Sequence, residues 1–243
     1  ELLNNYQFNN DTIIIRKSET KTKVHRKSYM LCISVKNYDS DGKCISIDTF
    51  FGFLITKVYY MSVLNIPLIR DKINYVIKKY GYPKDSYNAK ELVSALEDFP
   101  RSELLQISQN DLYKIASGIV SLTINPRIKL FIREDKAKKY ISSLIFVPKT
   151  KFNTQVRQRI EHILCNQFGG FVAKHYVKIG EGQLTRLQLI INLPDKIIPN
   201  YDINRVEKLI ASTINAWDDN LKEVLNNNFN KKEADKLFKK YQD

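Results

Sequence analysis

The order of hairpins and helices between residues 125 and 228 constrains the fold more than any other feature of the sequence. Arg127–Arg133 and Tyr140–Val147 are rich in branched and aromatic residues, and the short polar turn between them predicts a hairpin. A helix with an apolar stripe is predicted next, up to Phe168, where a pair of glycines ends it. Phe171–Ile179 and Leu184–Asn192 predict a second hairpin. The order is therefore two strands, a helix and two strands, with a last helix after them.

That last helix is long and amphipathic. Its apolar residues recur at helical spacing: Val206, Leu209, Ile210, Ile214, Trp217, Leu221, Val224 and Leu225. Without its first strand, the segment has the order βαββα, which is a ferredoxin-like unit lacking its last strand. In that fold the last strand lies beside the first, and Arg127–Arg133 would take the same place. We therefore predict a permuted ferredoxin-like or ACT-like antiparallel sheet of four strands, with both helices on one face.

The N-terminal part predicts a second antiparallel sheet. Thr12–Arg16 and Tyr29–Tyr38 have the composition of strands, and the Asp-Gly pair at Gly42 predicts a tight turn because it tolerates positive φ. Lys43–Leu54 then predicts the returning strand. The run Phe50-Phe51-Gly52-Phe53 is too apolar for a solvent-facing tip, so we expect it to be buried where the sheet meets the next helix.

Helices follow this sheet. Pro67 begins the first, which ends at Gly81, and two more are predicted at Ala89–Leu96 and Asp111–Ser121, the latter capped by Asn110 or Ser108. A curved sheet followed by helices is compatible with a PAS-like or ACT-like sensor module. The chain is therefore predicted to be α+β, with domains at residues 1–124 and 125–228. Residues 229–243 are predicted to begin a helical connection to a downstream region.

Composition bounds the partners. The 243 residues carry a net charge of +13, which raises the question of a nucleic-acid partner. The lysines are spread along the chain, however, and a bias of the whole coding sequence explains them more simply, so nucleic acid is disfavoured. No apolar run approaches the roughly 20 residues that span a bilayer, and the first residues do not resemble a signal peptide. We expect no membrane partner.

The three cysteines do not suggest a disulfide. They are odd in number and lack the C-x-x-C spacing. A hairpin turning at Gly42 would place Cys44 opposite Asp39 and Cys32 opposite Phe51, so these two thiols would not meet across the strands. Reduced cysteines and a cytoplasmic protein are the expectation.

Motifs for cofactor chemistry are incomplete. Gly180-Glu-Gly182 lacks the third glycine of a dinucleotide loop and lies between two strands, so it predicts a hairpin turn and no NAD site. His162 and Cys165 share a helix face, but a structural role is favoured over metal binding, and His25 and His175 come without a paired ligand motif. The segment from Gln167 to Lys174 matches the RNA-binding RNP1 pattern only in part, and it follows the first helix directly, whereas RNP1 belongs one strand later.

Three segments carry a family resemblance: Phe99-Pro-Arg-Ser-Glu-Leu-Leu-Gln-Ile-Ser108, Asn125-Pro-Arg-Ile-Lys-Leu-Phe-Ile-Arg133 and Phe146-Val-Pro-Lys-Thr-Lys-Phe-Asn-Thr154. With weaker matches from His25 to Tyr241, the chain resembles the N-terminal region of the large NAD-specific glutamate dehydrogenases of bacteria. The resemblance implies a cytoplasmic, oligomeric parent enzyme that oxidises L-glutamate to 2-oxoglutarate and ammonia with NAD. It also implies ACT-like modules ahead of a catalytic part that lies downstream of this chain. No catalytic or cofactor-binding residue is therefore expected here.

Two sets of residues are candidates for other roles. Where the second domain's first hairpin runs into its helix, an amino-acid effector is one hypothesis, with its carboxylate bound by Lys149, Lys151, Asn153, Thr154 and Arg157. The alternative is that Asn153 or Thr154 only caps the helix while the lysines are solvated. Contacts between the two domains are the expected role of Arg101, Glu103, Arg127 and Arg133.

Three functions follow. The first is a non-catalytic regulatory and assembly segment of a glutamate dehydrogenase, whose partners are the rest of its polypeptide and further copies of it. The second is a stand-alone module that binds an amino acid. The third is a nucleic-acid binder, whose association would collapse with added salt.

Overall fold

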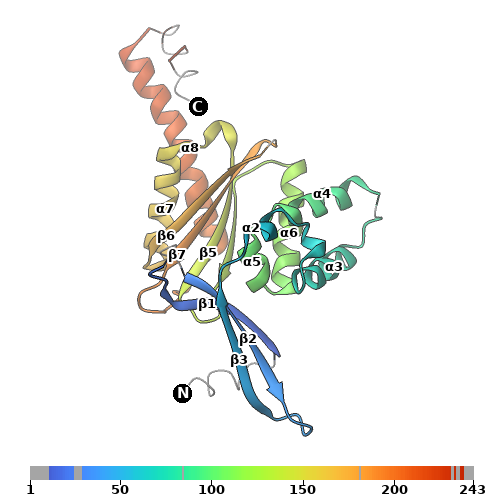
Figure 1. The fold of residues 1–243 in the computed structure, drawn as a ribbon. Helices are drawn as coiled ribbons and strands as arrows, with labels where there is room; N and C mark the ends of the chain where they lie inside the picture. The colour runs from blue at the N-terminus through green and yellow to red at the C-terminus, as the bar shows by residue number, and fades with distance from the viewer. Residues whose placement is uncertain are drawn as a thin grey trace. The chain divides into compact units, whose positions relative to one another are not determined.

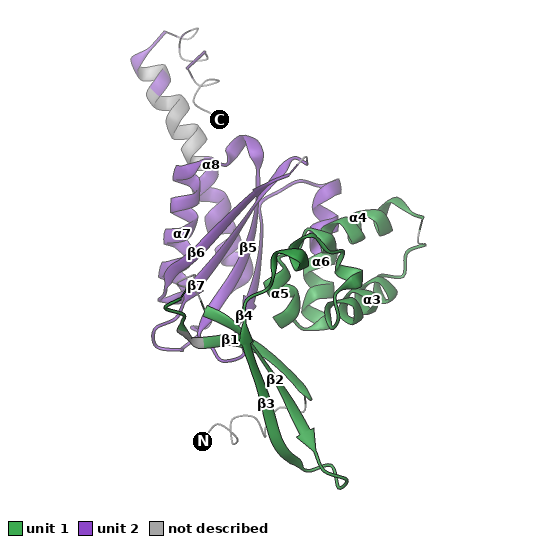
Figure 2. Cartoon of the chain, viewed as in Figure 1, with its two compact units in different colours: residues 1–117 green, residues 118–243 purple. Residues whose placement is uncertain are grey.

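The computed structural model describes residues 11–24, 29–83, 85–180 and 182–230, together with residues 233, 236 and 237. Within them the chain is α+β, with two antiparallel sheets and seven α-helices (Figure 1). It divides into two compact units, residues 1–117 and 118–243 (Figure 2). The division falls inside one helix, α6 (Gln109–Ile124), and each unit is described here by itself.

The first unit begins with a three-stranded antiparallel sheet in the order β1 (Ile13–Lys21), β2 (Tyr29–Tyr38) and β3 (Cys44–Gly52). The turn between β2 and β3 is held by the Asp39 carboxylate, which accepts from the backbone N–H groups of Asp41 and Lys43 at 3.1 and 2.8 Å. Gly42 takes the positive φ of 77° that this turn requires. The strand predicted from the sequence at Tyr29–Tyr38 has the same bounds as β2.

Two expectations for this sheet were wrong. Cys44 lies opposite Tyr38, not Asp39, because the register shifts by a bulge between Asn37 and Tyr38. Cys32 does lie opposite Phe51. The phenylalanines expected to be buried are exposed, by 63% at Phe50 and 58% at Phe51. They belong to an edge strand, and the short helix α2 (Thr56–Tyr60) that follows it buries none of its own residues.

Helices complete the first unit. After a 3-10 turn at Val63–Asn65 come α3 (Ile69–Tyr80), α4 (Tyr87–Glu97) and α5 (Arg101–Gln106). In α3 the side chains that recur at helical spacing and are buried are Ile69, Ile73 and Val76. Ser108 caps α6, since its hydroxyl accepts from the Asp111 N–H at 3.1 Å.

The second unit contains a four-stranded antiparallel sheet. Its strands are β4 (Lys129–Glu134), β5 (Tyr140–Pro148), β6 (Phe171–Ile179) and β7 (Leu184–Asn192), and they lie in the order β4-β5-β7-β6. The helices of this unit after the sheet begins are α7 (Thr154–Phe168) and α8 (Ile203–Asn228). Of the residues predicted along α8, the side chains of Trp217, Leu221 and Val224 lie outside those that the structure describes.

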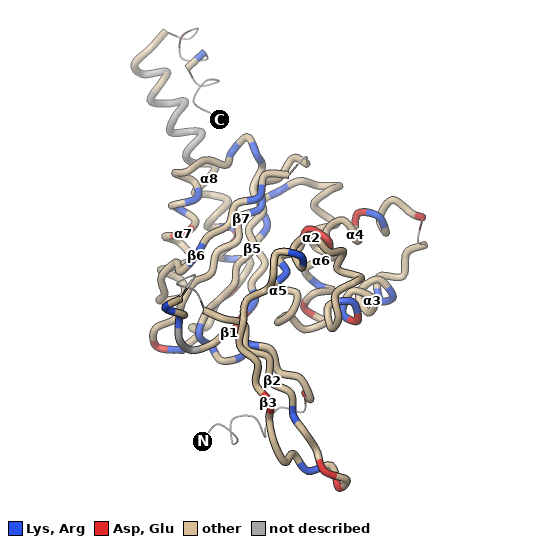
Figure 3. Tube along the Cα trace, in the orientation of Figure 1, with Lys and Arg blue, Asp and Glu red and all other residues tan. Residues whose placement is uncertain are grey.

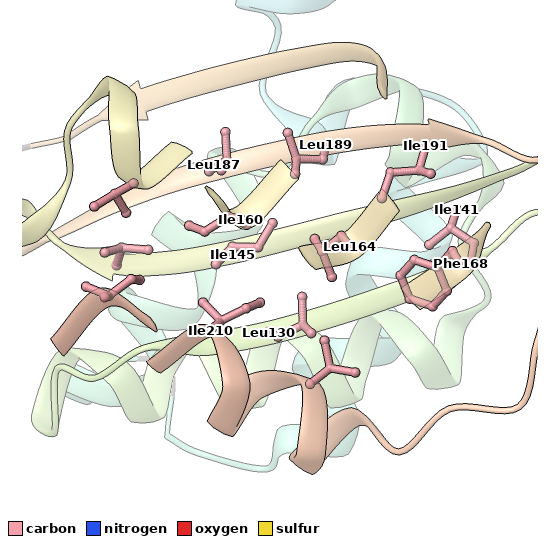
Figure 4. Close-up of a cluster of buried hydrophobic side chains, with 14 of the residues drawn as sticks. Leu130, Ile141, Ile145, Ile160, Leu164, Phe168, Leu187, Leu189, Ile191 and Ile210 are labelled. Atoms are coloured by element: carbon pink, nitrogen blue, oxygen red, sulfur yellow. The ribbon is translucent and has the colours of Figure 1, made fainter. Parts of the chain in front are cut away.

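One face of this sheet forms the core with both helices (Figure 4). Leu130, Ile145 and Leu187 lie opposite one another on three adjacent strands and are buried. The helices contribute residues at helical spacing to the same cluster: Val156, Ile160, Leu164 and Phe168 from α7, and Val206, Ile210 and Ile214 from α8. Removing these apolar side chains from water supplies about 1.5–3 kcal/mol each, which is the main force that holds the helices to the sheet.

Two glycines make the tight passage from α7 into β6. Gly169 ends the helix with a φ of 64°, in the left-handed region that favours glycine. Gly170 lies against the neighbouring strand, where an added Cβ would overlap the carbonyl oxygen of Asn192 and come within 2.8 Å of Ile191 Cγ2. This close approach sets the position of α7 over the sheet.

Candidate functional site

The loop between β5 and α7 holds the residues predicted to bind an effector. Pro148 ends β5, and Lys149–Lys151 form a single 3-10 turn before the chain enters α7. The Lys149 N–H donates to the Gln183 carbonyl at 2.9 Å, which ties the turn to the start of β7. Phe152 packs against the core cluster and anchors the other end of the loop. The loop therefore has a defined shape next to a helix N-terminus.

Asn153 is the cap of α7. Its side-chain oxygen accepts from the Val156 N–H at 2.9 Å, and its carbonyl accepts from the Arg157 N–H at 3.0 Å. Of the two caps that the sequence left open, Asn153 is the one observed, and Thr154 is the exposed first residue of the helix. Capping occupies one of the N–H groups that a bound anion would otherwise use.

The lysines of the loop differ in their surroundings. Lys151 Nζ donates to the Asn215 side chain of α8 at 2.8 Å, while the Lys149 side chain is half-buried. Lys149 and Lys151 both precede the first residue of α7 in the sequence, and the backbone dipole at that helix end favours a negative charge. Chemically, this end of the helix is suited to a carboxylate or another small anion.

Arg157 is already paired. It forms an ion pair with Glu161, one turn further along α7, and both side chains are only 18% exposed. Glu161 Oε1 also lies 3.4 Å from His175 Nδ1 on β6. Because the Glu161 carboxylate offsets the guanidinium charge, Arg157 contributes less to anion binding than the sequence alone predicts.

Of the residues predicted to make interdomain contacts, Arg101 and Glu103 belong to the first unit. Arg101 is buried and donates to the carbonyls of Glu97 and Met61 at 2.6 and 3.1 Å, and it forms a 3.0 Å ion pair with the Glu97 carboxylate. Glu103, on the same short helix, is also buried. Glu97 in turn accepts from the Ser62 hydroxyl at 2.5 Å and the Val63 N–H at 3.1 Å. This network joins α4 and α5 to the segment after α2.

The second pair of these residues lies in the second unit. Arg127 is exposed just before β4, and Arg133 donates from Nη2 to the Tyr140 hydroxyl at 3.1 Å across the hairpin. The Arg133 guanidinium also lies 5.5 Å from the centre of the Tyr140 ring. The role of all four residues in contacts between the domains stays a prediction.

Cysteine and histidine side chains are the other candidates for reactive or metal-binding groups. All three cysteines are free, and burial raises the pKa of the Cys165 thiol. His162 Nε2 lies 2.9 Å from the Asn166 side-chain amide on the same helix. No cluster of three potential metal ligands is present among the described residues, and His25 lies outside them. No helix within the described part of the chain is long and apolar enough to cross a membrane.

Charge is distributed over both units. Figure 3 shows Lys and Arg positions scattered along the traces of the two units and not massed on one element. In the second unit Lys129 is paired with Glu207 of α8 at 3.0 Å.

Burial and a 2.8 Å hydrogen bond to Glu134 raise the pKa of Tyr201, which keeps its hydroxyl protonated as a donor.

Sequence reasoning missed three residues around the loop. Glu161 could have been found, because it follows Arg157 by four positions on a predicted helix. Asn215 and Gln183 could not, since they lie 64 and 34 positions away from the lysines they contact and no local pattern marks them. Only the packing of α8 and β7 beside β5 brings them to the loop.

Comparison with known proteins gives two family matches. Residues 129–218 match the model described as "Glutamate dehydrogenase, ACT2 domain", which covers β4 to α8. Residues 66–124 match "Glutamate dehydrogenase, helical motif 1", which covers α3 to α6. The two matches therefore follow each other along the chain and together include the β5–α7 loop.

Three curated relatives share most of the chain. The NAD-specific glutamate dehydrogenase of Halomonas elongata is 32% identical over 227 residues, which is 93% of this chain and 14% of the relative. Those of Pseudomonas aeruginosa and Mycobacterium tuberculosis are 28% and 23% identical over 84% and 86% of the chain. These matches cover 12% and 13% of the two relatives. The chain thus spans about an eighth of the length of the relatives it matches.

Proposed function

The chain belongs to the family of NAD-specific glutamate dehydrogenases, and from this premise we propose that it is a non-catalytic regulatory and assembly segment of such an enzyme. The observation that carries the proposal is the small share of each relative that the chain covers, 12–14%, together with its match to an ACT2 domain and a helical motif. The parent polypeptide oxidises L-glutamate with NAD and water to 2-oxoglutarate, ammonia and NADH. NAD binds to another part of that polypeptide.

The strand order supports the ACT-like part of this proposal. In the order β4-β5-β7-β6, β5, β6 and β7 occupy the places of the first three strands of a ferredoxin-like sheet, and β4 occupies the place of the fourth. Both helices contribute to the core cluster on one face. We propose from this order that the second unit is a permuted ferredoxin-like domain. For the first unit, with its three-stranded meander, a PAS-like or an ACT-like module stays the proposal. The domain limits at 124 and 228 belong to the same proposal.

An amino acid is the effector that the β5–α7 loop fits. Lys149 is the residue on which this depends most, because Asn153 is used as a cap and Arg157 is paired with Glu161. An α-carboxylate beside Lys149 would add an anion where the α7 dipole favours one. A second copy of this domain is the partner expected to close the loop from the other side, in a cytoplasmic homo-oligomer.

The edge strand β6 is the surface that supports assembly. Large apolar side chains on it are exposed although it belongs to a folded sheet: Phe171, Tyr176, Val177 and Ile179. It is the last strand of its sheet, so one side of its backbone has no neighbouring strand among the described elements. Exposed apolar edges of this kind pair readily with another chain.

Turnover and effector binding test the proposal separately. The complete polypeptide should reduce NAD in the presence of L-glutamate, and residues 1–243 expressed alone should not. A screen of amino acids against the complete polypeptide should find one that raises the melting temperature, because a ligand that binds the native state stabilises it. Lys149→Met should abolish the shift, whereas Lys208→Met, an exposed lysine on α8, should leave it unchanged.

Two results would contradict the proposal. Glutamate oxidation by residues 1–243 alone would contradict a non-catalytic segment. A native polypeptide of about the size of this chain would instead favour the stand-alone amino-acid-binding module. Binding to nucleic acid that weakens steeply with added salt would instead favour the nucleic-acid-binding function.

A further inference from the structure

The first sheet has an apolar face formed by Ile13, Ile15, Ile33, Val35 and Phe50, called the open face below. Ile15, Ile33 and Phe50 lie directly opposite one another on β1, β2 and β3, and Ile13 lies opposite Val35. Because side chains alternate between the two faces of a strand, all five point to the same side of the sheet. The open face therefore includes residues from all three strands of the sheet.

The apolar side chains of the open face are more exposed than the middle of the opposite face. On the open face Phe50 is 63% exposed and Ile13 is 38% exposed, while the other three side chains are only half-buried. On the opposite face Cys32 and Ser34 are almost completely buried, and the Ser34 hydroxyl lies 3.0 Å from that of Thr49. The row Ile15, Ile33 and Phe50 thus lacks a covering layer, although Asp48 and the buried Leu31 lie on the same face beside it. Contiguous exposed apolar surface of this kind marks an interaction site.

The second sheet shows what such a layer does in this protein. Its equivalent row, Leu130, Ile145 and Leu187, is buried under the amphipathic helices α7 and α8. Domains of this class are stable because a sheet face packs against helices. The row Ile15, Ile33 and Phe50 has the same width and the same apolar character, so a helical layer is the cover that fits it.

We propose that the open face docks an amphipathic helical segment of the same polypeptide that lies outside residues 1–243. The length of the relatives supports this occupant: the chain covers 12–14% of them, so most of such a polypeptide is available to supply the layer. Docking on β1 to β3 would place the first unit inside a larger domain. The inference rests on the family membership used for the proposed function, but not on effector binding.

Photo-crosslinking of the complete polypeptide tests the proposal directly. Benzoylphenylalanine is placed in place of Phe50, where the side chain is similar in shape and already exposed in this unit. Irradiation should link it to one defined peptide outside residues 1–243, in a product with the mass of a single polypeptide, and dilution should not lower the yield. The same side chain in place of Ile13, on the same face, should reach the same peptide. In place of Tyr60, which is 86% exposed on α2, it should give no such product.

Three other outcomes of the crosslinking would overturn the inference. A product of twice the polypeptide mass whose yield falls on dilution would assign the open face to a second copy. A link to residues 1–10 would assign it to the start of this chain. If position 50 gives no more crosslinked product than position 60, the open face has no docked segment and is exposed to solvent. If the crosslink forms as expected but no amino acid raises the melting temperature, the effector proposal is contradicted and the docking proposal stands.

Discussion

At the scale of single residues, Lys72 shows how one cation can hold the end of a helix. Its ammonium group donates to the carbonyl oxygens of Leu104, Leu105 and Ile107 at 2.9, 2.8 and 2.8 Å. These carbonyls belong to the last turn of α5 and the residue after it, where no intrahelical donor remains for them. A cation at this end also complements the helix dipole.

Lys72→Met should therefore destabilise the first unit. Methionine keeps the apolar length of the side chain but leaves the carbonyls without their donor, at a cost of about 1–3 kcal/mol in the free energy of unfolding. Urea denaturation measures the loss. Lys78→Met on the same helix is the matched control, because the Lys78 side chain is exposed. It should change stability by no more than about 0.5 kcal/mol. Equal losses would show that the carbonyl contacts are not the cause.

Asn153 allows capping and effector binding to be separated. Asn153→Ala removes the acceptor of the Val156 N–H and should lower the free energy of unfolding by about 1 kcal/mol. Asn153→Asp keeps an acceptor at the same place and should retain stability, because a carboxylate there also complements the helix dipole. The same carboxylate should weaken binding of an amino acid, because it repels the effector's own carboxylate. A decrease in stability for Asp as large as for Ala would contradict the capping role.

Residue-level prediction succeeded where the signal was local. The choice between Asn153 and Thr154 as cap could be narrowed to two positions, because a cap needs a short polar side chain at a helix start. The partners of Lys151 and Lys72 could not be predicted, since they lie 64 residues and more than 30 residues away in the sequence. Such contacts depend on the packing of whole elements, which no spacing in the sequence records.

At the scale of elements, Gly170 controls how closely α7 follows the sheet. Gly170→Ala places a methyl group against the Asn192 carbonyl and within 3.2 Å of Leu193 Cδ2, so the helix or the strand must shift. We expect a loss of about 1–3 kcal/mol, as for other overpacked sites. Gly180→Ala is the control, because no described atom would lie within 4 Å of the new methyl group. Thermal denaturation that ranks the two variants alike would exclude the close approach as a constraint.

The edge strand β6 makes a prediction about assembly. Val177→Lys adds a charge to an exposed apolar position at the centre of the exposed edge, where Lys174 and Lys178 are already close in sequence. If β6 pairs with another copy, the desolvation of this charge should weaken the complex. Sedimentation velocity of the complete polypeptide should show smaller assemblies at the same concentration. Lys208→Met, away from β6 on α8, should sediment as the unchanged protein does.

Elements with strong local signals were predicted closely. Tyr29–Tyr38, Phe171–Ile179 and Leu184–Asn192 have the bounds expected from strand composition and flanking turns. The helices α2 and α5 were not predicted, because they have five and six residues and begin without a side-chain cap. Burial of Phe50 and Phe51 was wrong for a different reason: composition shows that a segment needs a partner, but not whether that partner lies within these residues.

At the scale of the whole molecule, two compact units share one continuous helix. The core cluster of the second unit is drawn from residues 130 to 214, while the Lys72 and Arg101 networks are confined to the first. The boundary between the units falls between Ser117 and Gly118, inside α6. Cooperative unfolding of each unit around its own core is therefore expected, with α6 as the covalent connection.

Hydrogen exchange of Gly170→Ala and Lys72→Met tests whether the two units unfold independently. In Gly170→Ala, amide exchange should become faster in β4 to β7 and α7, while α3 and α4 exchange as in the unchanged protein. In Lys72→Met the pattern should be reversed, because opening of the first unit does not require the core of the second to open. Amide exchange in the first half of α6 should become faster in Lys72→Met, and exchange in its second half should become faster in Gly170→Ala. Faster exchange throughout the chain in both variants would mean that the units unfold as one, and the division between Ser117 and Gly118 would then have no energetic meaning.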